Sequence, residues 1–337
     1  MISHSLRQNQ MMNKENSEQF EVAAIDAGKR FDLLLTEKNI DYSRSFVADQ
    51  IKSGFITVNN KPVKPSYITK AGDIVSANFQ SPQNDVEQIG EDIPLDIVFE
   101  NSDVIVINKQ PGLVVHPGCG NTTGTLVHAL INHFPDIKEA ISKIKSADSE
   151  SRPGIVHRLD KDTSGTMIVA KNSRALTSLS KQIKNRTVQK KYIALCYGWP
   201  TSQTGRLVNS IARSTRNRKI MAETSEANGK EAITEYNILE YYYFKEAKVS
   251  LIEFNIKTGR THQIRVQSSI KNIPVLGDLV YGNKHSIKLS KELGIGRILL
   301  HSKSLSINLP GDPKPSIFES PTPDDFLVIF AKLHKQE

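Results

Sequence analysis

A polar stretch at residues 81–94, SPQNDVEQIGEDIP, separates two regions that each have the hydrophobic patterning of a folded domain. The region before it is short, over residues 24–80, and the region after it is long, over residues 95–335. The first 20 residues are polar and lack an apolar stretch, so we expect a disordered tail over residues 1–20. The sequence therefore predicts a tail, a small domain, a linker over residues 81–94 and a large domain.

The long region mixes predicted strands and helices in an irregular order. TMIVAK at residues 166–171 is typical of a buried strand, and residues 173–185 place Leu176 and Leu179 on one face of a helix. Strands are also expected in IVFENSDVIVINKQPG, KKYIALCYG and VSLIEFNIKTG, and an amphipathic helix is expected over residues 124–134. Because this order is not a regular βαβ repeat, the sequence predicts an α+β fold with a mixed, largely antiparallel sheet.

The balance of charge and the cysteine count limit the classes of function. The chain carries 44 Lys and Arg against 36 Asp and Glu, a net charge of +8, which favours a polyanionic partner such as nucleic acid. Its two cysteines, Cys119 and Cys196, form no CxxC pair and no cluster with histidines, so we expect no disulfide framework and no metal site. No apolar run reaches the roughly 18 residues of a membrane span, and no signal peptide is recognisable, so a cytosolic protein without membrane contact is expected.

The small region has a helix–helix–sheet pattern with positive charges at the ends of the elements. Residues 44–52 predict a helix that ends at Gly54, and FITVNN and AGDIVSANF predict strands. The cations at the element ends, which can contact RNA phosphates, are Lys29, Arg30, Arg44, Lys52 and Lys61. The alternative is an ordinary α/β module with a solvated charged face. The segment SRSFVADQIKSGFITVNNKPVKPSYITKAGDIV resembles the S-four RNA-binding domain, which favours RNA binding.

Two carboxylates lie close together in the segment HRLDKDTSG, residues 157–165. On a strand, Asp160 and Asp162 would share a face and could act as the acid–base couple of a hydrolase. Asp162, before Thr-Ser-Gly, also fits a turn in which its side chain accepts backbone N–H groups. Asp160 lies between Arg158 and Lys161, which favour its ionised form. A carboxylate in a protein that binds RNA repels phosphate, so Asp160 is either a reactive group or part of a structural ion pair.

The longer segment around these carboxylates resembles a known family of enzymes. PGIVHRLDKDTSGTMIVAK is similar to the His-Arg-Leu-Asp signature of the RluA/RluD-type pseudouridine synthases. INKQPGLVVHPG precedes it, and KKYIALCYG, TGRTHQIRVQ, PVLGDLVYG and LLHSKSL follow in the family's order. The resemblance covers residues 90–330 and, together with the small domain, is closest to the RluD-type enzymes of bacterial large-subunit ribosomal RNA. One departure is Gln267, where the family more often has His.

The resemblance implies a role for several residues of this chain. It implies that Asp160 is the catalytic aspartate, that Arg265 pairs with it, and that Tyr192 stacks on the uracil and accepts a proton. It further implies that Arg158 fills the place of the base in its stack. The remaining residues implied to contact the substrate are Leu159 and Ile264.

Each of these positions also has an ordinary structural interpretation. Tyr192, in an apolar strand, is typical of a core residue, and Arg265, on an expected helix, is typical of a surface cation. His157 and His262 could serve as acid–base groups, but we expect structural roles because the family motif assigns the chemistry to other residues.

The function implied by the resemblance is isomerisation of uridine to pseudouridine in RNA, most simply large-subunit ribosomal RNA or an assembling ribosomal subunit. The isomerisation exchanges no electrons or atoms, so no cofactor and no metal are expected, and a monomer is expected. One alternative is a non-catalytic RNA-binding or ribosome-assembly factor, which does not require Asp160, Tyr192 and Arg265 to converge. The other is a carboxylate-pair hydrolase using Asp160 and Asp162, which requires an open groove with both carboxylates in it.

Overall fold

A computed structural model describes residues 17–38, 44–79, 89–118, 121–141, 152–217 and 220–336 of the chain. These residues divide into two compact units. One unit comprises Met1–Gln88 with Ser142–Ser151, and the other comprises Ile89–Ile141 with Arg152–Glu337. Within the described residues, no helix is long and apolar enough to cross a membrane.

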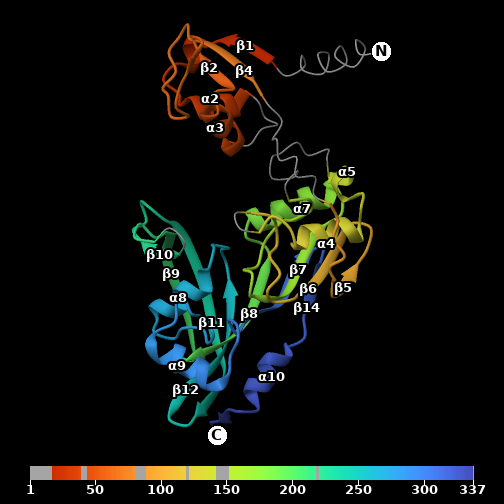
Figure 1. Ribbon diagram of the computed structural model, residues 1–337, viewed down its shortest axis with the longest axis vertical. Coiled ribbons are helices and arrows are strands. Elements are labelled where there is room, and N and C mark those ends of the chain that lie inside the picture. The colour runs from red at the N-terminus through yellow and green to blue at the C-terminus, as the bar shows by residue number, and fades with distance from the viewer. Residues whose placement is uncertain are drawn as a thin grey trace, which may run out of the picture. The chain divides into compact units, whose positions relative to one another are not determined.

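The small unit packs helices against a four-stranded antiparallel sheet (Figure 1). The strands follow the order β1-β4-β2-β3, with β1 at Ser17–Glu21, β4 at Ile74–Asn78, β2 at Ile56–Val58 and β3 at Lys61–Pro62. The helices are α2 at Phe31–Lys38 and α3 at Arg44–Lys52. A left-handed Gly54, with φ of 78°, follows α3 as the sequence predicts. The core of the unit is apolar and includes Phe31, Leu34, Leu35, Val47, Ile51 and Ile56.

The predicted tail is wrong for residues 17–20, because these residues belong to strand β1. Ser17 to Glu21 pair with Asn78 to Ile74 in antiparallel register, so the small unit begins before residue 24. The partner strand lies more than fifty positions further along the chain, and SEQFE has too little apolar alternation to predict a strand locally. The prediction for residues 1–16 lies outside the described residues.

The end of the predicted linker is held by the large unit. The N–H of Glu91 donates to the carbonyl of His128 at 3.0 Å, and the Glu91 carboxylate accepts the N–H of Gly124 at 3.0 Å. At Gly90, an added Cβ would meet the backbone of Asn132 at 2.7 Å, so the chain passes too close for a side chain. Residues 89–94 therefore belong to the large unit, and residues 81–88 of the predicted linker lie outside the described residues.

The large unit is built on an 11-stranded sheet (Figure 1). Its strands are β5 (Ile97–Glu100), β6 (Val104–Lys109), β7 (Ser164–Ala170), β8 (Gln189–Tyr197), β9 (Thr204–Arg213), β10 (Met221–Thr224), β11 (Lys230–Phe244), β12 (Ala247–Ile256), β13 (Leu300–Asn308), β14 (Pro315–Glu319) and β15 (His334–Lys335). Their order is β10-β9-β11-β12-β8-β13-β7-β6-β5, with β14 beside β13 and β15 beside β11. Among the described strands, β13 and β7 form the one parallel pair. This confirms the mixed, largely antiparallel α+β fold.

The helices of the large unit are α4 (Leu126–His133), α5 (Ile137–Ile141), α7 (Ser173–Lys184), α8 (Gln263–Ile270), α9 (Lys284–Leu293) and α10 (Asp324–Phe330). The expected helix over residues 173–185 is confirmed as α7. It begins where the side chain of Asn172 accepts the N–H of Ala175 at 2.9 Å, and it buries Leu176 and Leu179 against the sheet. The expected strands at residues 166–171 and in KKYIALCYG are confirmed as β7 and β8.

Strand β13 brings the start of β7 and the middle of β8 together. In its register, His301 faces Ser164 of β7, while Ser302 faces both Gly165 of β7 and Tyr192 of β8. Gly165 has φ of 112°, and an added Cβ would meet the carbonyl oxygen of Ser302 at 2.2 Å, so only glycine allows this approach. The loop before β7, which carries HRLDKDT, is thereby placed beside Tyr192.

Candidate active site

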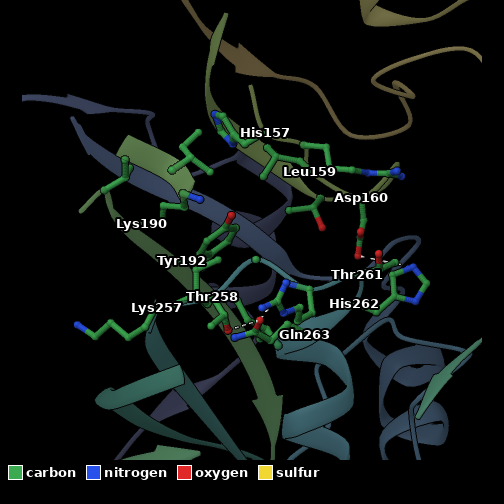
Figure 2. A pocket seen from close by; sticks show the side chains of 18 of the residues that line it. His157, Leu159, Asp160, Lys190, Tyr192, Lys257, Thr258, Thr261, His262 and Gln263 are labelled. Carbon is green, nitrogen blue, oxygen red and sulfur yellow. Dashed lines mark hydrogen bonds and ion pairs between the residues drawn. The ribbon is translucent and has the colours of Figure 1, made fainter. Parts of the chain in front are cut away.

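A pocket of about 480 Å³ opens between the loop before β7, strand β8 and the start of α8. Asp160 comes from the loop, Tyr192 from β8, and His262 and Arg265 from the turn and helix that follow β12. Figure 2 shows Asp160, Tyr192 and His262 on the walls of this pocket. We call it the Asp160 pocket. Sequence positions more than 100 residues apart therefore contribute to one site.

The loop that carries Asp160 is fixed by two basic side chains. The Nζ of Lys109 donates to the carbonyls of Gln110, Leu113 and Lys161 at 2.8–2.9 Å, and its side chain is almost completely buried. Burial lowers the pKa of Lys109 to about 7, against the opposing effect of the nearby carboxylates. Arg297 donates to the carbonyl of Asp162 at 3.1 Å. These contacts hold the backbone on the C-terminal side of Asp160 in place.

Asp160 is paired with a buried arginine that a second carboxylate holds. The Nη1 of Arg265 lies 3.4 Å from Oδ2 of Asp160. Its Nε and Nη2 donate to the two carboxylate oxygens of Asp278 at 2.7 and 3.1 Å. Arg265 is 6% exposed and Asp278 is 2% exposed, so the fork is rigid and shielded from water. The interpretation of Arg265 as a surface cation is wrong.

Tyr192 is buried in β8 but also lines the Asp160 pocket. Burial raises the pKa of its phenol well above the ordinary value, the negative charge of Asp160 raises it further, and a hydrogen bond with Ser302 opposes both effects. The phenol is therefore neutral near pH 7. Its ring belongs to the core on one side and reaches the pocket on the other.

The structure brings together the other residues expected to contact the substrate. Arg158 lines the pocket and is exposed, whereas Leu159 and Ile264 line it as buried apolar side chains. All of the pocket residues expected from the sequence thus reach one cavity, as the enzymatic interpretation requires.

The two histidines of the motifs lie in different settings. The Nε2 of His157 accepts the N–H of Ile168 at 3.1 Å, and burial lowers the pKa of this imidazole to about 3, so His157 is neutral and structural. His262 is closer to the chemistry, because its Nε2 lies 3.9 Å from Oδ2 of Asp160.

Asp162 does not share the pocket with Asp160. The N–H of Thr163 donates to the carbonyl of Asp160 at 3.1 Å, which closes a tight turn around Asp162. Among the described residues that line the pocket, Asp160 is present and Asp162 is not. The geometry therefore favours the turn interpretation of Asp162 over a carboxylate-pair hydrolase.

The roles of three groups of residues at this site were not predicted from the sequence. Asp278 and Tyr281 lie in PVLGDLVYG, whose resemblance was noted without a role for either, and Lys109 lies in INKQPG. Basic residues around the pocket were also missed: Lys184, Arg186, Lys190, Lys257 and Arg260. The clustering of Lys and Arg in KKYIALCYG and in KTGRTH was an available signal for them.

The cations expected to bind RNA in the small unit mostly have local partners. Lys29 pairs with Asp26 and Glu37, Arg30 forms a forked pair with Asp32, and Lys52 pairs with Asp49. Lys61 is exposed on β3, and the side chain of Arg44 lies outside the described residues.

No group of three or more His, Cys, Asp or Glu side chains in the described residues has the arrangement of a metal site. Cys196 is buried and unpaired in β8, and Cys119 lies outside the described residues.

Comparison with known proteins gives two family matches and a set of full-length relatives. Residues 103–269 match the model described as RNA pseudouridylate synthase, and residues 29–75 match the S4 domain. An RNA pseudouridine synthase of Chlorobaculum parvum, described as uncharacterized, is 38% identical over 326 residues, 93% of this chain and 96% of the relative. Ribosomal large subunit pseudouridine synthase D of Neisseria meningitidis serogroup A is 39% identical over 313 residues, 91% of this chain and 79% of the relative.

A solved structure supports the same relationship over most of the chain. The human protein titled RNA Pseudouridylate Synthase Domain Containing 1 is 28% identical to this chain and superposes with a TM-score of 0.56. The match covers 73% of this chain and 91% of the human chain.

Proposed function

The chain belongs to the family of RNA pseudouridine synthases, isomerases that convert uridine to pseudouridine in RNA, and from that premise we propose that Asp160 carries the reaction. The observation that supports this assignment is the fork in which Asp278 fixes Arg265, and Arg265 reaches Asp160 inside a pocket that Tyr192 also lines. Both resemblances drawn from the motifs, to the RluA/RluD-type synthases and to the S-four domain, are confirmed by the family matches and relatives.

The reaction requires one ionised group that acts on a nucleotide. The N-glycosidic bond breaks, the base turns, and a bond forms between the anomeric carbon and the fifth ring carbon, from which a proton leaves. An ionised carboxylate can attack the sixth ring carbon, attack the anomeric carbon or remove a sugar proton. In each route Asp160 must be charged and correctly oriented, and the guanidinium of Arg265 faces its carboxylate with a positive charge and orients it.

The other pocket residues have complementary proposed roles. In our proposal the neutral phenol of Tyr192 stacks against the uracil, and its hydrogen bond with Ser302 fixes the ring. The role of proton acceptor implied by the resemblance is not carried over, because only the phenolate would accept a proton. Leu159 and Ile264 provide apolar walls for the base. The base must leave its helix to reach the pocket, which costs a few kcal/mol, and the exposed Arg158 offsets part of this cost by filling the vacated stack.

We propose large-subunit ribosomal RNA, free or in an assembling subunit, as the substrate. Relatives that match most of this chain are named for the ribosomal large subunit. The S4 domain at residues 29–75 supports a second contact with RNA, to which Lys29, Arg30, Arg44, Lys52 and Lys61 are proposed to contribute. The monomeric state and the cytosolic location stay predictions.

A tritium-release assay tests the function directly. Uridine labelled with tritium at the fifth ring carbon loses the label as the new carbon–carbon bond replaces that hydrogen. We expect the protein to release tritium from a labelled large-subunit ribosomal RNA transcript. Tight binding of this RNA without release would support the non-catalytic RNA-binding alternative instead.

Removal of metal ions should leave the chemistry intact. The proposed reaction needs no Lewis acid, because the carboxylate of Asp160 and the guanidinium of Arg265 supply the required charges. Tritium release from a metal-free transcript is therefore expected to persist in excess EDTA. Loss that only zinc restores would contradict this expectation, whereas loss that magnesium reverses would report on folding of the RNA.

Deletion of residues 1–80 should weaken RNA binding without changing the chemistry. The residues that line the Asp160 pocket all lie in the large unit, and the small unit acts in our proposal as a tethered second RNA grip. We expect weaker affinity, a flatter dependence of affinity on salt because fewer phosphates are neutralised, and poorer discrimination between uridines. The single-turnover rate at saturating RNA should change little.

The measurement is single-turnover kinetics of both proteins over a range of RNA and salt concentrations, with circular dichroism as the control for folding. A folded truncated protein that keeps its affinity but loses the saturated rate would show that the small unit helps to build the active site. That result would contradict the division of labour.

A further inference from the structure

Tyr281 contacts both groups that face the carboxylate of Asp160. Its hydroxyl lies 2.7 Å from Nδ1 of His262, and the guanidinium carbon of Arg265 lies 4.8 Å from the centre of its ring. The ring of His262 packs edge-on against the same phenol, with centroids 5.5 Å apart. One side chain thus supports the arginine by its face and the histidine by its hydroxyl.

The position of Tyr281 is itself set by the carboxylate that holds Arg265. Oδ1 of Asp278 accepts the N–H of Tyr281 at 3.0 Å and the N–H of Val280 at 2.9 Å, in addition to Nη2 of Arg265. The carbonyl of Tyr281 accepts the hydroxyl of Ser269 at 2.7 Å. The phenol therefore stands on a backbone that is fixed on both sides.

The hydrogen-bond partners of the Tyr281 hydroxyl indicate which atom accepts its proton. The backbone N–H of Met221, in β10, donates to this oxygen at 2.8 Å. A phenol that accepts in this way still has its own proton to donate, and Nδ1 of His262 lies 2.7 Å from its oxygen. Burial raises the pKa of Tyr281 above its ordinary value, so the hydroxyl keeps that proton near pH 7.

A histidine that accepts at Nδ1 carries its proton at Nε2, provided that it is neutral. Burial lowers the pKa of His262 and the positive charges of Arg265 and Arg158 lower it further, whereas the negative charges of Asp160 and Asp278 raise it. The net direction is downward, so the neutral imidazole prevails near pH 7. Its Nε2 is the atom that lies 3.9 Å from Oδ2 of Asp160.

We propose that Tyr281 is a positioning residue that fixes His262 as the Nε2–H tautomer, so that a proton donor and not a lone pair faces Asp160. The proposal rests on the proposed function of Asp160 and adds a second N–H group that faces its carboxylate. With the opposite tautomer, the lone pair of Nε2 would face the carboxylate and oppose its charge.

The hydrogen-bond chain begins at an edge of the sheet. Among the described strands, β10 is the last strand of the sheet order and pairs only with β9, and its first residue, Met221, donates to Tyr281. The hydrogen bonds continue through Tyr281 to His262, whose Nε2 lies 3.9 Å from Oδ2 of Asp160. Correct docking of β10 is therefore part of what prepares the carboxylate for reaction.

Nitrogen-15 NMR of histidine-labelled wild-type protein measures the tautomer without any substitution in the chain under test. Protonated and unprotonated ring nitrogens differ strongly in chemical shift, and the spectrum of His262→Gln assigns the signals. We expect His262 to carry its proton at Nε2 near pH 7. A proton at Nδ1 in the wild-type protein would overturn the proposal.

Two substitutions of Tyr281 distinguish the role of its hydroxyl from the role of its ring. Tyr281→Phe keeps the face under Arg265 and removes the donor to His262, so we expect a mixture of tautomers and a saturated single-turnover rate reduced by about tenfold, the effect of losing roughly 1.4 kcal/mol. RNA affinity should not change. Tyr281→Leu also removes the ring face and should reduce the rate further. Tyr241→Phe is the matched control, because its hydroxyl contacts Gln203 outside the pocket.

A Tyr281→Phe protein with an unchanged tautomer would overturn the proposal, whether its rate falls or not. So would a shifted tautomer with a wild-type saturated rate. A wild-type protein with the Nε2–H tautomer but no tritium release from any RNA would contradict the proposed function, while the NMR result would still establish the hydrogen-bond chain. The two failures are therefore distinguishable.

Discussion

Asp160→Asn is expected to abolish tritium release while the protein still folds. Asparagine has nearly the shape of aspartate but no charge and no nucleophilic oxygen, so every route open to the carboxylate is lost. Loss of the reactive group of an enzyme costs on the order of 10⁴-fold or more in rate. Single-turnover tritium release over long times measures this loss, and the thermal midpoint of unfolding checks that the fold is kept. RNA binding should persist or strengthen, because one negative charge is removed from the pocket.

Asp162→Asn is the matched control for Asp160→Asn. It makes the same chemical change two residues away, in a residue that turns the chain and does not line the pocket. We expect this variant to keep substantial activity. If Asp160→Asn released tritium at a rate comparable to that of the wild-type protein, the assignment of the catalytic carboxylate would be wrong.

Asp278→Asn is expected to reduce both stability and rate. Its carboxylate is buried and accepts two hydrogen bonds from Arg265, and removal of one partner of such a buried pair costs about 3–5 kcal/mol. The freed guanidinium can swing out of the position in which Nη1 reaches Asp160, so we expect the saturated rate to fall by on the order of 10²-fold. Denaturant unfolding measures the first effect, and single-turnover kinetics measure the second.

Glu292→Gln provides the comparison for Asp278→Asn. Glu292 also pairs with a cation, Lys245, but the side chain of Lys245 is 71% exposed and neither residue lines the Asp160 pocket. An exposed pair contributes about 0.2–1 kcal/mol, so a small loss of stability is expected. Equal effects of the two substitutions on the rate would mean that the Asp278 fork does not orient Asp160.

Local patterns in the sequence were sufficient to predict most of the framework. The short continuous apolar runs in TMIVAK and KKYIALCYG predicted β7 and β8, and the helical spacing of Leu176 and Leu179 predicted α7. These elements are stabilised mainly by burial of their own apolar side chains. Their own sequences therefore contain the pattern that predicts them. Strand β1 was missed because it depends on pairing with β4, far along the chain.

Prediction of the site was limited in the same way. Residues in local motifs were recognised, and residues whose role depends on contacts between distant segments were not. Asp160, Tyr192 and Arg265 were recognised from motifs, and they converge on one pocket. Asp278 was overlooked because its importance depends on a contact with Arg265 across a turn and a change of direction of the chain, which spacing does not reveal. Tyr281 was overlooked for a similar reason, since its partners come from β10 and α8.

Charge in the small unit illustrates the opposite error. The cations at the ends of its elements were expected to be available to phosphates, yet Lys29 and Arg30 are already paired with carboxylates of the same unit. A count of charges cannot separate a cation that has a local partner from one that has none. The basic residues around the Asp160 pocket come from separate segments of the chain, such as Lys190 on β8 and Lys257 after β12, and the fold brings these segments together.

The measurement that tests the account most directly is a map of pseudouridine in large-subunit ribosomal RNA from cells with the protein, without it, and with only the Asp160→Asn form. We expect one or more modified positions to disappear when the protein is removed, to return with the wild-type chain, and to stay absent with Asp160→Asn. An unchanged map after removal of the protein would contradict the proposed substrate. A map restored by the Asp160→Asn form would contradict the proposed chemistry.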